Sequence, residues 1–230
     1  MFKKTIFTGM SLILILAMAI TFSSPAAMAI DELEALLAED LEIPTKVEDL
    51  IAKFSLLDYQ VKTIQNGTTS YDAYNSYRYL GQENIQGETT DKLSLEIQPV
   101  NQQSNSIILW MTDGEFKQAE YQGQIIPGEM FNMMAGNVLD AVFAPFHNIS
   151  EYNLEELADI GEVSSSQKMI GDKEVEVISV TVEDVPESEI ESGIVHLANL
   201  DNFLMVVGFD YISGVEDIQQ IFEVTAFELR

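Results

Sequence analysis

The sequence predicts an α+β fold in which helices pack on the concave face of one curved antiparallel sheet. Most of the chain consists of segments with alternating apolar and polar residues, separated by turn pairs such as Asn66-Gly67 and Asp113-Gly114. This pattern is typical of hairpin-connected strands. Helical apolar spacing appears near the start and in the middle of the chain. The order helix, meander, helix, meander favours a single sheet carrying its helices on one side.

Residues 1–29 have the pattern of an export signal. Lys3 and Lys4 precede an apolar run, and Ala27-Met28-Ala29 matches an A-x-A cleavage site. The alternative is an uncleaved membrane anchor, but the run is short for a membrane span and polar residues follow it at once. We therefore expect a signal peptide over 1–29 and one exported domain over 30–230, in the periplasm or outside the cell.

Two short helices are expected next. In residues 31–41, Asp31 and Glu34 stand at capping-box spacing. Residues 46–57 follow a second capping box, and their apolar residues recur at helical spacing. The members of this stripe are Val47, Leu50, Ile51, Phe54 and Leu57.

Strands are expected from residue 71 onward. Residues 71–85 are rich in tyrosine, residues 91–99 alternate strictly, and residues 106–123 form a hairpin that turns at Asp113-Gly114. Tyrosines at 71, 74, 77 and 79 could stack a sugar, or could simply be strand residues. The second interpretation is favoured because tyrosine is a common strand residue.

A methionine-rich helix is expected over Met130–Phe146, with Pro145 ending or kinking it at Ala144. Its apolar stripe is broad, and methionine adapts to irregular or variable surroundings. Two interpretations stay open for this helix. It packs a core, or it covers a cavity for an apolar ligand.

The C-terminal third is expected to be β again, after a short helix capped by Asn153. Strands are predicted over 173–184, 191–198, 202–212 and 216–230, which makes about nine strands in the chain. In the last of them, alternation places Phe222, Val224 and Ala226 on one face. Ile221, Thr225, Phe227 and Leu229 then fall on the other face.

The composition excludes several functions. A formal net charge of −27 argues against nucleic-acid binding, which needs a basic surface. Screening relieves such self-repulsion at high ionic strength, so a salt-loving source is a hypothesis. The chain has no cysteine, hence no disulfide and no thiolate metal site. We expect no cofactor, no metal and no enzymatic activity, because the known catalytic motifs are absent and both histidines, His147 and His196, have structural explanations.

The layout of residues 30–230 resembles the LolA/LolB-like lipoprotein-carrier superfamily. The segments that carry the resemblance are KVEDLIAKF, DKLSLEI, ILWMTDGEF, the helix after Pro127-Gly128, GDKEVEVISVTVED, NFLMVVGFDYI and IFEVTAFEL. The resemblance implies an incomplete β-barrel, or half-barrel, whose helices form a lid over an apolar cavity. One feature differs: the carriers tend to have an Arg-Pro turn where this chain has Asp91-Lys92. Lid closure through that arginine is therefore not expected.

The resemblance favours an exported, non-enzymatic carrier or binding protein that shelters a lipid, an acyl chain or a lipoprotein. An envelope protein is a further candidate partner. The expected apolar lining consists of Met130, Phe131, Met134, Leu139, Val142 and Phe143, with Leu50, Ile51 and Phe54 from the N-terminal helix and Trp110 and Phe116 at the rim. The alternative is a structural or regulatory envelope module with a filled core and no ligand. An enzyme is third, and would require a pocket with converging polar groups.

Overall fold

A computed structural model describes residues 47–147, 161–183, 190–200, 203–214 and 217–230; within these ranges, the side chains of residues 47, 48, 134–141, 147 and 190 are not described. The predicted signal peptide, the helix over 31–41 and the helix capped by Asn153 lie outside the described residues. In the described ranges, neither helix combines the length and apolar character needed to cross a membrane.

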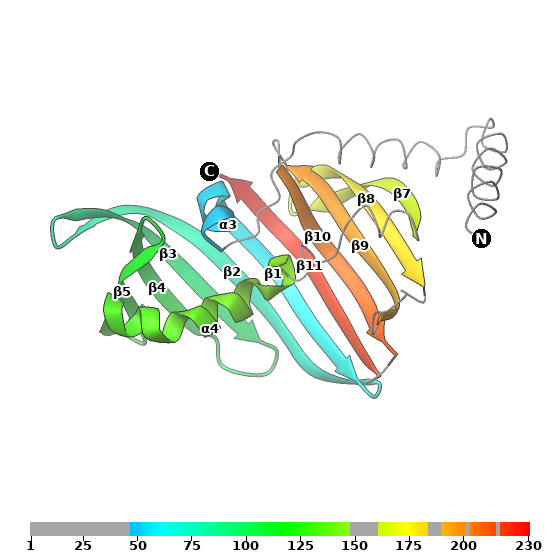
Figure 1. The fold of residues 1–230 in the computed structure, drawn as a ribbon, viewed down its shortest axis with the longest axis horizontal. Helices are drawn as coiled ribbons and strands as arrows, with labels where there is room; N and C mark the ends of the chain where they lie inside the picture. The colour runs from blue at the N-terminus through cyan, green and yellow to red at the C-terminus, as the bar shows by residue number, and fades with distance from the viewer. Residues whose placement is uncertain (1–46, 148–160, 184–189, 201–202, 215–216) are drawn as a thin grey trace, which may run out of the picture.

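The described strands form one open antiparallel sheet of 11 strands (Figure 1). In chain order they are β1 (Phe54–Gln65), β2 (Thr68–Ile85), β3 (Glu88–Pro99), β4 (Asn105–Thr112), β5 (Glu115–Tyr121), β6 (Gln124–Pro127), β7 (Glu162–Ile170), β8 (Lys173–Glu183), β9 (Ile190–Leu200), β10 (Phe203–Ser213) and β11 (Ile218–Leu229). Across the sheet the order is β6-β5-β4-β3-β2-β1-β11-β10-β9-β8-β7. Two meanders therefore meet where β1 pairs with β11. The predicted antiparallel sheet is confirmed, and it is open because β6 and β7 lie at its opposite edges. Its predicted curvature and the helices on a concave face stay predictions.

The predicted hairpin turns are confirmed by the backbone angles. Asp113 and Gly114 have φ values of 51° and 78°, and Asn66 and Gly67 have 50° and 71°. Positive φ at both central residues defines the type I′ turn, whose twist matches that of paired strands. These turns set the register of β1–β2 and of β4–β5.

The predicted helix over 46–57 is too long, because α3 (Val47–Lys53) ends where β1 begins at Phe54. A β-bulge explains the error. Phe54 pairs with Leu229 and Leu56 with Glu228, so Ser55 is an extra residue in β1. The bulge brings Phe54 and Leu57 to the same buried face although three positions separate them. The bulge therefore gives the apolar residues of this strand the three-residue spacing that is typical of a helix.

A second bulge corrects the predicted faces of β11. Asp58 pairs with Ala226 and Tyr59 with Val224, which leaves Thr225 as the extra residue. Phe227 consequently joins Val224 in the buried cluster instead of lying on the opposite face.

The methionine-rich helix is confirmed as α4 (Gly128–His147), but Pro145 does not end it at Ala144. Proline lacks the N–H that would bond the carbonyl four residues back. The end of the helix is held instead by tertiary packing, because Phe146 is buried against the sheet.

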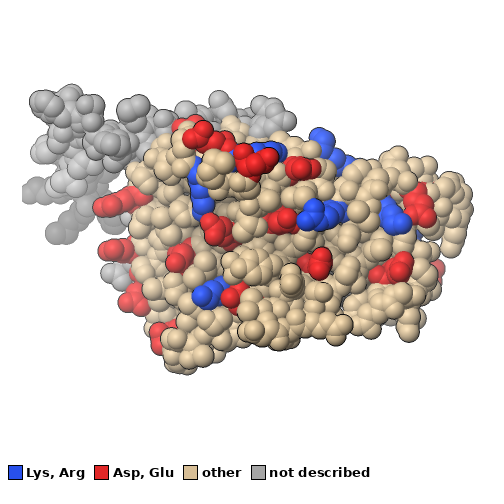
Figure 2. Space-filling model, turned by 180° about the vertical axis from the view of Figure 1, so that it is seen from behind, with Lys and Arg blue, Asp and Glu red and all other residues tan. Residues whose placement is uncertain are grey.

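The two faces of the central strands differ in chemistry. α4 crosses the face seen in Figure 1, whereas the face seen from behind in Figure 2 carries scattered acidic and basic side chains. Arg78 and Asp58 lie 3.4 Å apart on this rear face. Antiparallel sheets commonly combine one covered face with one solvated face in this way. The candidate site therefore belongs to the face under α4.

Candidate functional site

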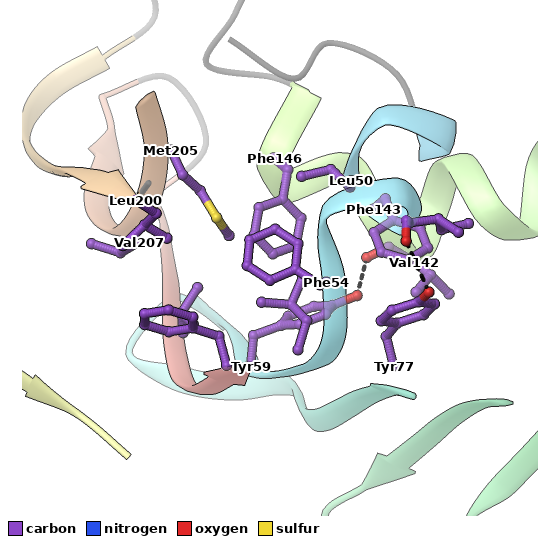
Figure 3. Close-up of a cluster of buried hydrophobic side chains, with 14 of the residues drawn as sticks. Leu50, Phe54, Tyr59, Tyr77, Val142, Phe143, Phe146, Leu200, Met205 and Val207 are labelled. Atoms are coloured by element: carbon purple, nitrogen blue, oxygen red, sulfur yellow. Dashed lines mark hydrogen bonds between the residues drawn. The ribbon is translucent and has the colours of Figure 1, made fainter. Parts of the chain in front are cut away.

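An apolar layer lies between the sheet and helices α3 and α4. Its members are buried side chains that contact one another across several elements. They include Leu50 and Ile51 of α3, Phe131, Val142, Phe143 and Phe146 of α4, Phe54, Leu57 and Tyr59 of β1, Tyr77 of β2, Leu93 and Leu95 of β3, Leu109 of β4, Met205 and Val207 of β10, and Phe222, Val224 and Phe227 of β11. Figure 3 shows part of this layer, with side chains of β1, β10 and α4 pointing toward one another.

The C-terminal end of α4 is attached by an aromatic cluster. The ring of Phe146 lies 5.1 Å from that of Tyr59 and 4.9 Å from that of Phe222, both nearly perpendicular to it. Tyr59 and Phe222 are themselves 5.7 Å apart. Edge-to-face contacts of this kind stabilise a core beyond the apolar area they bury.

Two buried tyrosines also tie the helices to the sheet (Figure 3). The Tyr59 hydroxyl donates to the carbonyl of Val142 in α4, and the Tyr77 hydroxyl donates to the carbonyl of Ile51 in α3 at 3.1 Å. Burial raises the pKa of both phenols far above its ordinary value, so both stay neutral donors.

Removing the Tyr59 hydroxyl should weaken this attachment. We expect Tyr59→Phe to lower the free energy of unfolding by about 0.5–1.5 kcal/mol, because one buried hydrogen bond is lost. Urea unfolding followed by circular dichroism measures the change. Tyr71→Phe is the matched control, since Tyr71 is 44 % exposed and should show no effect. Equal stability of the two variants would contradict the role of the Tyr59 hydroxyl.

The N-terminal end of α4 is attached to β5 by different contacts. The Asn132 side chain pairs with the peptide of Phe116, accepting from its N–H at 3.3 Å and donating to its carbonyl at 3.2 Å. The rings of Phe116 and Phe131 lie 5.2 Å apart, edge to face. Gly128 approaches the β5 backbone so closely that a Cβ there would lie 2.7 Å from the carbonyl carbon of Lys117. α4 is therefore attached at both ends of its length.

One polar atom in the layer has no partner. Of the three buried polar residues in the described ranges, Thr90 donates to the carbonyl of Glu83 at 2.8 Å and Ser179 is 2.8 Å from His196 Nδ1. The side-chain oxygen of Asn75 is buried without a hydrogen bond. Asn75 pairs in register with Tyr59, so the two side chains share the face under α4.

The structure brings most of the expected lining residues together. Phe131, Val142, Phe143, Leu50, Ile51 and Phe54 are buried in the layer, and Phe116 is partly buried against it. Phe54 contributes from β1 and not from a helix. Met130 is 56 % exposed and is not part of the layer. The side chains of Met134 and Leu139 lie outside the described residues, so their role stays a prediction.

Trp110 lies on the opposite face of the sheet from the layer. Its Nε1 donates to Glu83 Oε2 at 3.0 Å, and the Lys92 ammonium is 2.9 Å from the same oxygen. Lys92 Nζ also lies 4.9 Å from the centre of the indole ring. Alternation explains the placement, because the neighbours Leu109 and Met111 face the layer.

Sequence patterns did not reveal several residues that build the site. Tyr59 was hidden because the bulge at Ser55 disguised the start of β1. Asn75 and Tyr77 belong to the tyrosine-rich strand. Its exposed tyrosines, Tyr71 and Tyr74, stand at an odd and an even position, so alternation places them on opposite faces of the strand. The tyrosines therefore do not form one platform for stacking a sugar. The alternation of residues 73, 75, 77 and 79 was the signal that could have placed Asn75 on the buried face.

Polar pairs in the described residues include His196 with Ser179, and Glu83 with Lys92 and Trp110. No group of three metal-ligating side chains occurs among these residues. His196 is half-buried beside Ser179, and burial, with a smaller effect of Lys168, lowers its pKa. The pKa of Glu83 is lowered by hydrogen bonds from Lys92 and Trp110.

Arg230 links the end of β11 to α3 and β3. Its guanidinium lies 3.6 Å from the centre of the Tyr79 ring and 3.0 Å from Asp91 Oδ2. The backbone N–H of Arg230 donates to the carbonyl of Lys53 at 2.9 Å. Partial burial alone would raise the pKa of Asp91, but hydrogen bonds from Arg230 and Gln82 outweigh it and hold the pKa below its ordinary value.

This network should make stability depend on pH. A carboxyl whose pKa is lower in the folded state stabilises that state above its unfolded pKa of 3.8 and loses this contribution as the pH falls through the folded value. Asp91→Asn should cost about 0.5–1 kcal/mol at pH 7. The deficit should shrink below pH 3.8. Urea unfolding of Asp91→Asn, Arg230→Met and the double variant measures the coupling. A deficit that is unchanged from neutral to acidic pH would contradict the ion pair.

Comparison with known proteins adds the following. No protein-family model matches the chain, and no curated protein matches it in sequence. Among solved structures, MucB is 12% identical, with a TM-score of 0.36. The match covers 88% of this chain but only 58% of MucB. The lipoprotein LppX of Mycobacterium tuberculosis is 10% identical (TM-score 0.34; 84% of this chain and 95% of LppX). The LolA superfamily protein NE2245 of Nitrosomonas europaea is 8% identical, with a TM-score of 0.31. The match covers 90% of this chain and 94% of NE2245. A LolA superfamily protein is thus among the solved structures that this chain is similar to.

Proposed function

We propose that this protein is an exported, non-enzymatic binder or carrier of an apolar ligand, such as a lipid or the acyl chain of a lipoprotein. The observation that carries the proposal is the apolar layer under α4, which extends across strands of both meanders. An apolar ligand binds by burying surface, at roughly 25 cal/mol per Å², and needs few polar contacts. The apolar side chains that are only partly buried against the layer offer this kind of surface.

We propose that the ligand lies beside α4, where the layer is incompletely covered. Val61, Ile97 and Ile107 are apolar and only partly buried against the layer. Ile97 follows Asn75 in the same cross-strand row, and Ile107 pairs with Leu95 in the next row. We call Val61, Ile97 and Ile107 the apolar strip. An acyl chain lying along it would cover surface that the described residues leave partly exposed.

A filled-core envelope module is the second candidate. The observation that favours it is the dense packing at the C-terminal end of α4, where three aromatic rings occupy the space between helix and sheet. In that case the apolar face serves stability alone, and a protein partner replaces the ligand. The two candidates differ in whether a small apolar molecule accompanies the protein.

Native mass spectrometry of the full-length gene product, purified from its own host in high salt, tests the proposal. We expect a co-purifying apolar molecule at a fixed ratio, which organic extraction then identifies. A second assay measures uptake of a fluorescent fatty acid. A bare protein mass together with no uptake would contradict the carrier and favour the filled-core module.

Paired variants locate the site. Ile97→Lys introduces a charge on the apolar strip at a partly exposed position, so the fold should tolerate it while uptake falls at least about tenfold, since a buried unpaired charge costs more than 1.4 kcal/mol. Gln98→Lys adds the same charge at the adjacent exposed position and should leave uptake unchanged. Equal uptake by both variants would show that the ligand lies elsewhere.

A further inference from the structure

We infer that Asn75 recognises the head group of the ligand, and that this head group is neutral and donates a hydrogen bond. The inference rests on the proposed function. An amide N–H or a hydroxyl at the end of an apolar chain has the required chemistry, because the side-chain oxygen of Asn75 is an acceptor.

The first argument is burial without a partner. Asn75 is 6 % exposed, and its Oδ1 is fully enclosed with no hydrogen bond. Folding removed this oxygen from water without replacing the hydrogen bond it lost, which is unfavourable. The other buried polar side chains of the described ranges, Thr90 and Ser179, do have partners. Asn75 is thus the exception that needs an explanation.

The second argument is that the neighbouring donors are already used. A phenol has a single O–H, and the hydroxyls of Tyr59 and Tyr77 donate theirs to the carbonyls of Val142 and Ile51. The register partner on the other side, Ile97, has an apolar side chain. Neither tyrosine can satisfy Asn75 without releasing a helix, so these described neighbours leave the acceptor available to a bound molecule.

The third argument is position. Asn75 lies in one cross-strand row between Tyr59, which is under the end of α4, and Ile97, which belongs to the apolar strip. A chain lying on the strip therefore brings its terminal group to Asn75. The residue would fix the depth and direction of the ligand, while the strip supplies most of the buried area.

The fourth argument concerns charge. An amide oxygen carries partial negative charge and offers nothing to a carboxylate, and the protein as a whole has a formal net charge of −27. Lys92 and Arg230 are each paired with an acid, Glu83 and Asp91. A neutral head group therefore suits this site better than a fatty-acid anion.

Competition binding with the full chain tests the inference. The readout is displacement of a neutral fluorescent dye by palmitamide, which has amide N–H donors, by methyl palmitate, which has none, and by palmitate. Wild-type protein should bind palmitamide about tenfold more tightly than methyl palmitate, as expected for one buried hydrogen bond. Palmitate should bind more weakly than palmitamide.

Two variants assign the preference to the side chain. Asn75→Leu keeps the branching at Cγ and removes the acceptor, so the palmitamide preference should disappear while methyl palmitate binds as before. The same variant without ligand should unfold at a higher urea concentration than wild type, because a buried unpaired polar atom has been removed. Gln98→Leu, a similar change at an exposed position, should keep the preference.

The outcomes separate this inference from the proposed function. If wild type binds both ligands equally, or if Asn75→Leu retains the preference, the role of Asn75 is wrong and the apolar site stands. If wild type binds none of the three compounds, the proposed function fails and this inference fails with it.

Discussion

Replacement of Phe146 by alanine is expected to lower the free energy of unfolding by about 3–5 kcal/mol, the usual cost of truncating a buried phenylalanine. Phe146 is buried and contacts the rings of both Tyr59 and Phe222. Truncation leaves a cavity between α4 and the sheet that rigid strands on one side cannot close. The C-terminal end of α4 should then detach first, with loss of hydrogen-exchange protection there before the strands are affected.

Chemical unfolding and hydrogen exchange of Phe146→Ala measure this effect. Met133→Ala is the control on the same helix, because Met133 is 88 % exposed and its truncation should change stability by less than about 0.5 kcal/mol. A loss below 1 kcal/mol for Phe146→Ala would mean that the aromatic cluster does not hold α4.

Gly128→Ala is expected to destabilise the protein by about 2–4 kcal/mol, although alanine favours a helix over glycine by about 1 kcal/mol. The added Cβ would overlap the carbonyl oxygen of Phe116 and lie 2.7 Å from the carbonyl carbon of Lys117. Both obstacles are backbone atoms of β5 and cannot rotate away. α4 must therefore shift, which would also break the pairing between Asn132 and the Phe116 peptide.

Unfolding in urea, together with amide chemical shifts of β5, tests Gly128→Ala. Glu129→Ala, at the next and exposed position, is the matched control and should cost far less. Stabilisation by Gly128→Ala would show that the helix tolerates a shift, and that helix propensity outweighs the close contact.

The two ends of α4 are attached to the sheet by different kinds of contact. The N-terminal attachment is mainly polar and backbone-directed, through Asn132 and Gly128, whereas the C-terminal attachment is aromatic. A ligand on the apolar strip would lie between them. Weakening either end should therefore change how fast a ligand enters more than which ligand binds.

Most of the architecture could be predicted from local patterns. Alternation in residues 91–99 placed Leu93, Leu95 and Ile97 on the covered face, and the residues of the Asp113-Gly114 pair marked a type I′ turn. The methionine-rich segment was long and periodic enough to identify α4. These features depend on short-range chemistry, which is why one sequence reveals them.

The errors have a common physical origin in long-range pairing. The bulges at Ser55 and Thr225 exist only because β1 and β11, separated by more than a hundred residues, pair with a mismatch in register. No local pattern indicates such a mismatch. It inverted the expected face of Phe227 and gave the start of β1 the apolar spacing of a helix. β7 was missed because EVSSSQKMI is polar and has little apolar alternation.

The sequence by itself determined that the surface is acidic, where the strands and turns lie, and that an apolar helix is present. These features follow from residue chemistry and near-neighbour spacing. Only the tertiary structure decided that Tyr59 and Phe222 meet Phe146, that Trp110 faces away, and that Asn75 is enclosed without a partner. Those outcomes depend on strand register and on where α4 crosses the sheet. Register is set by pairing across the whole chain, so contacts between distant residues, and with them the candidate site, emerge only when the chain is folded.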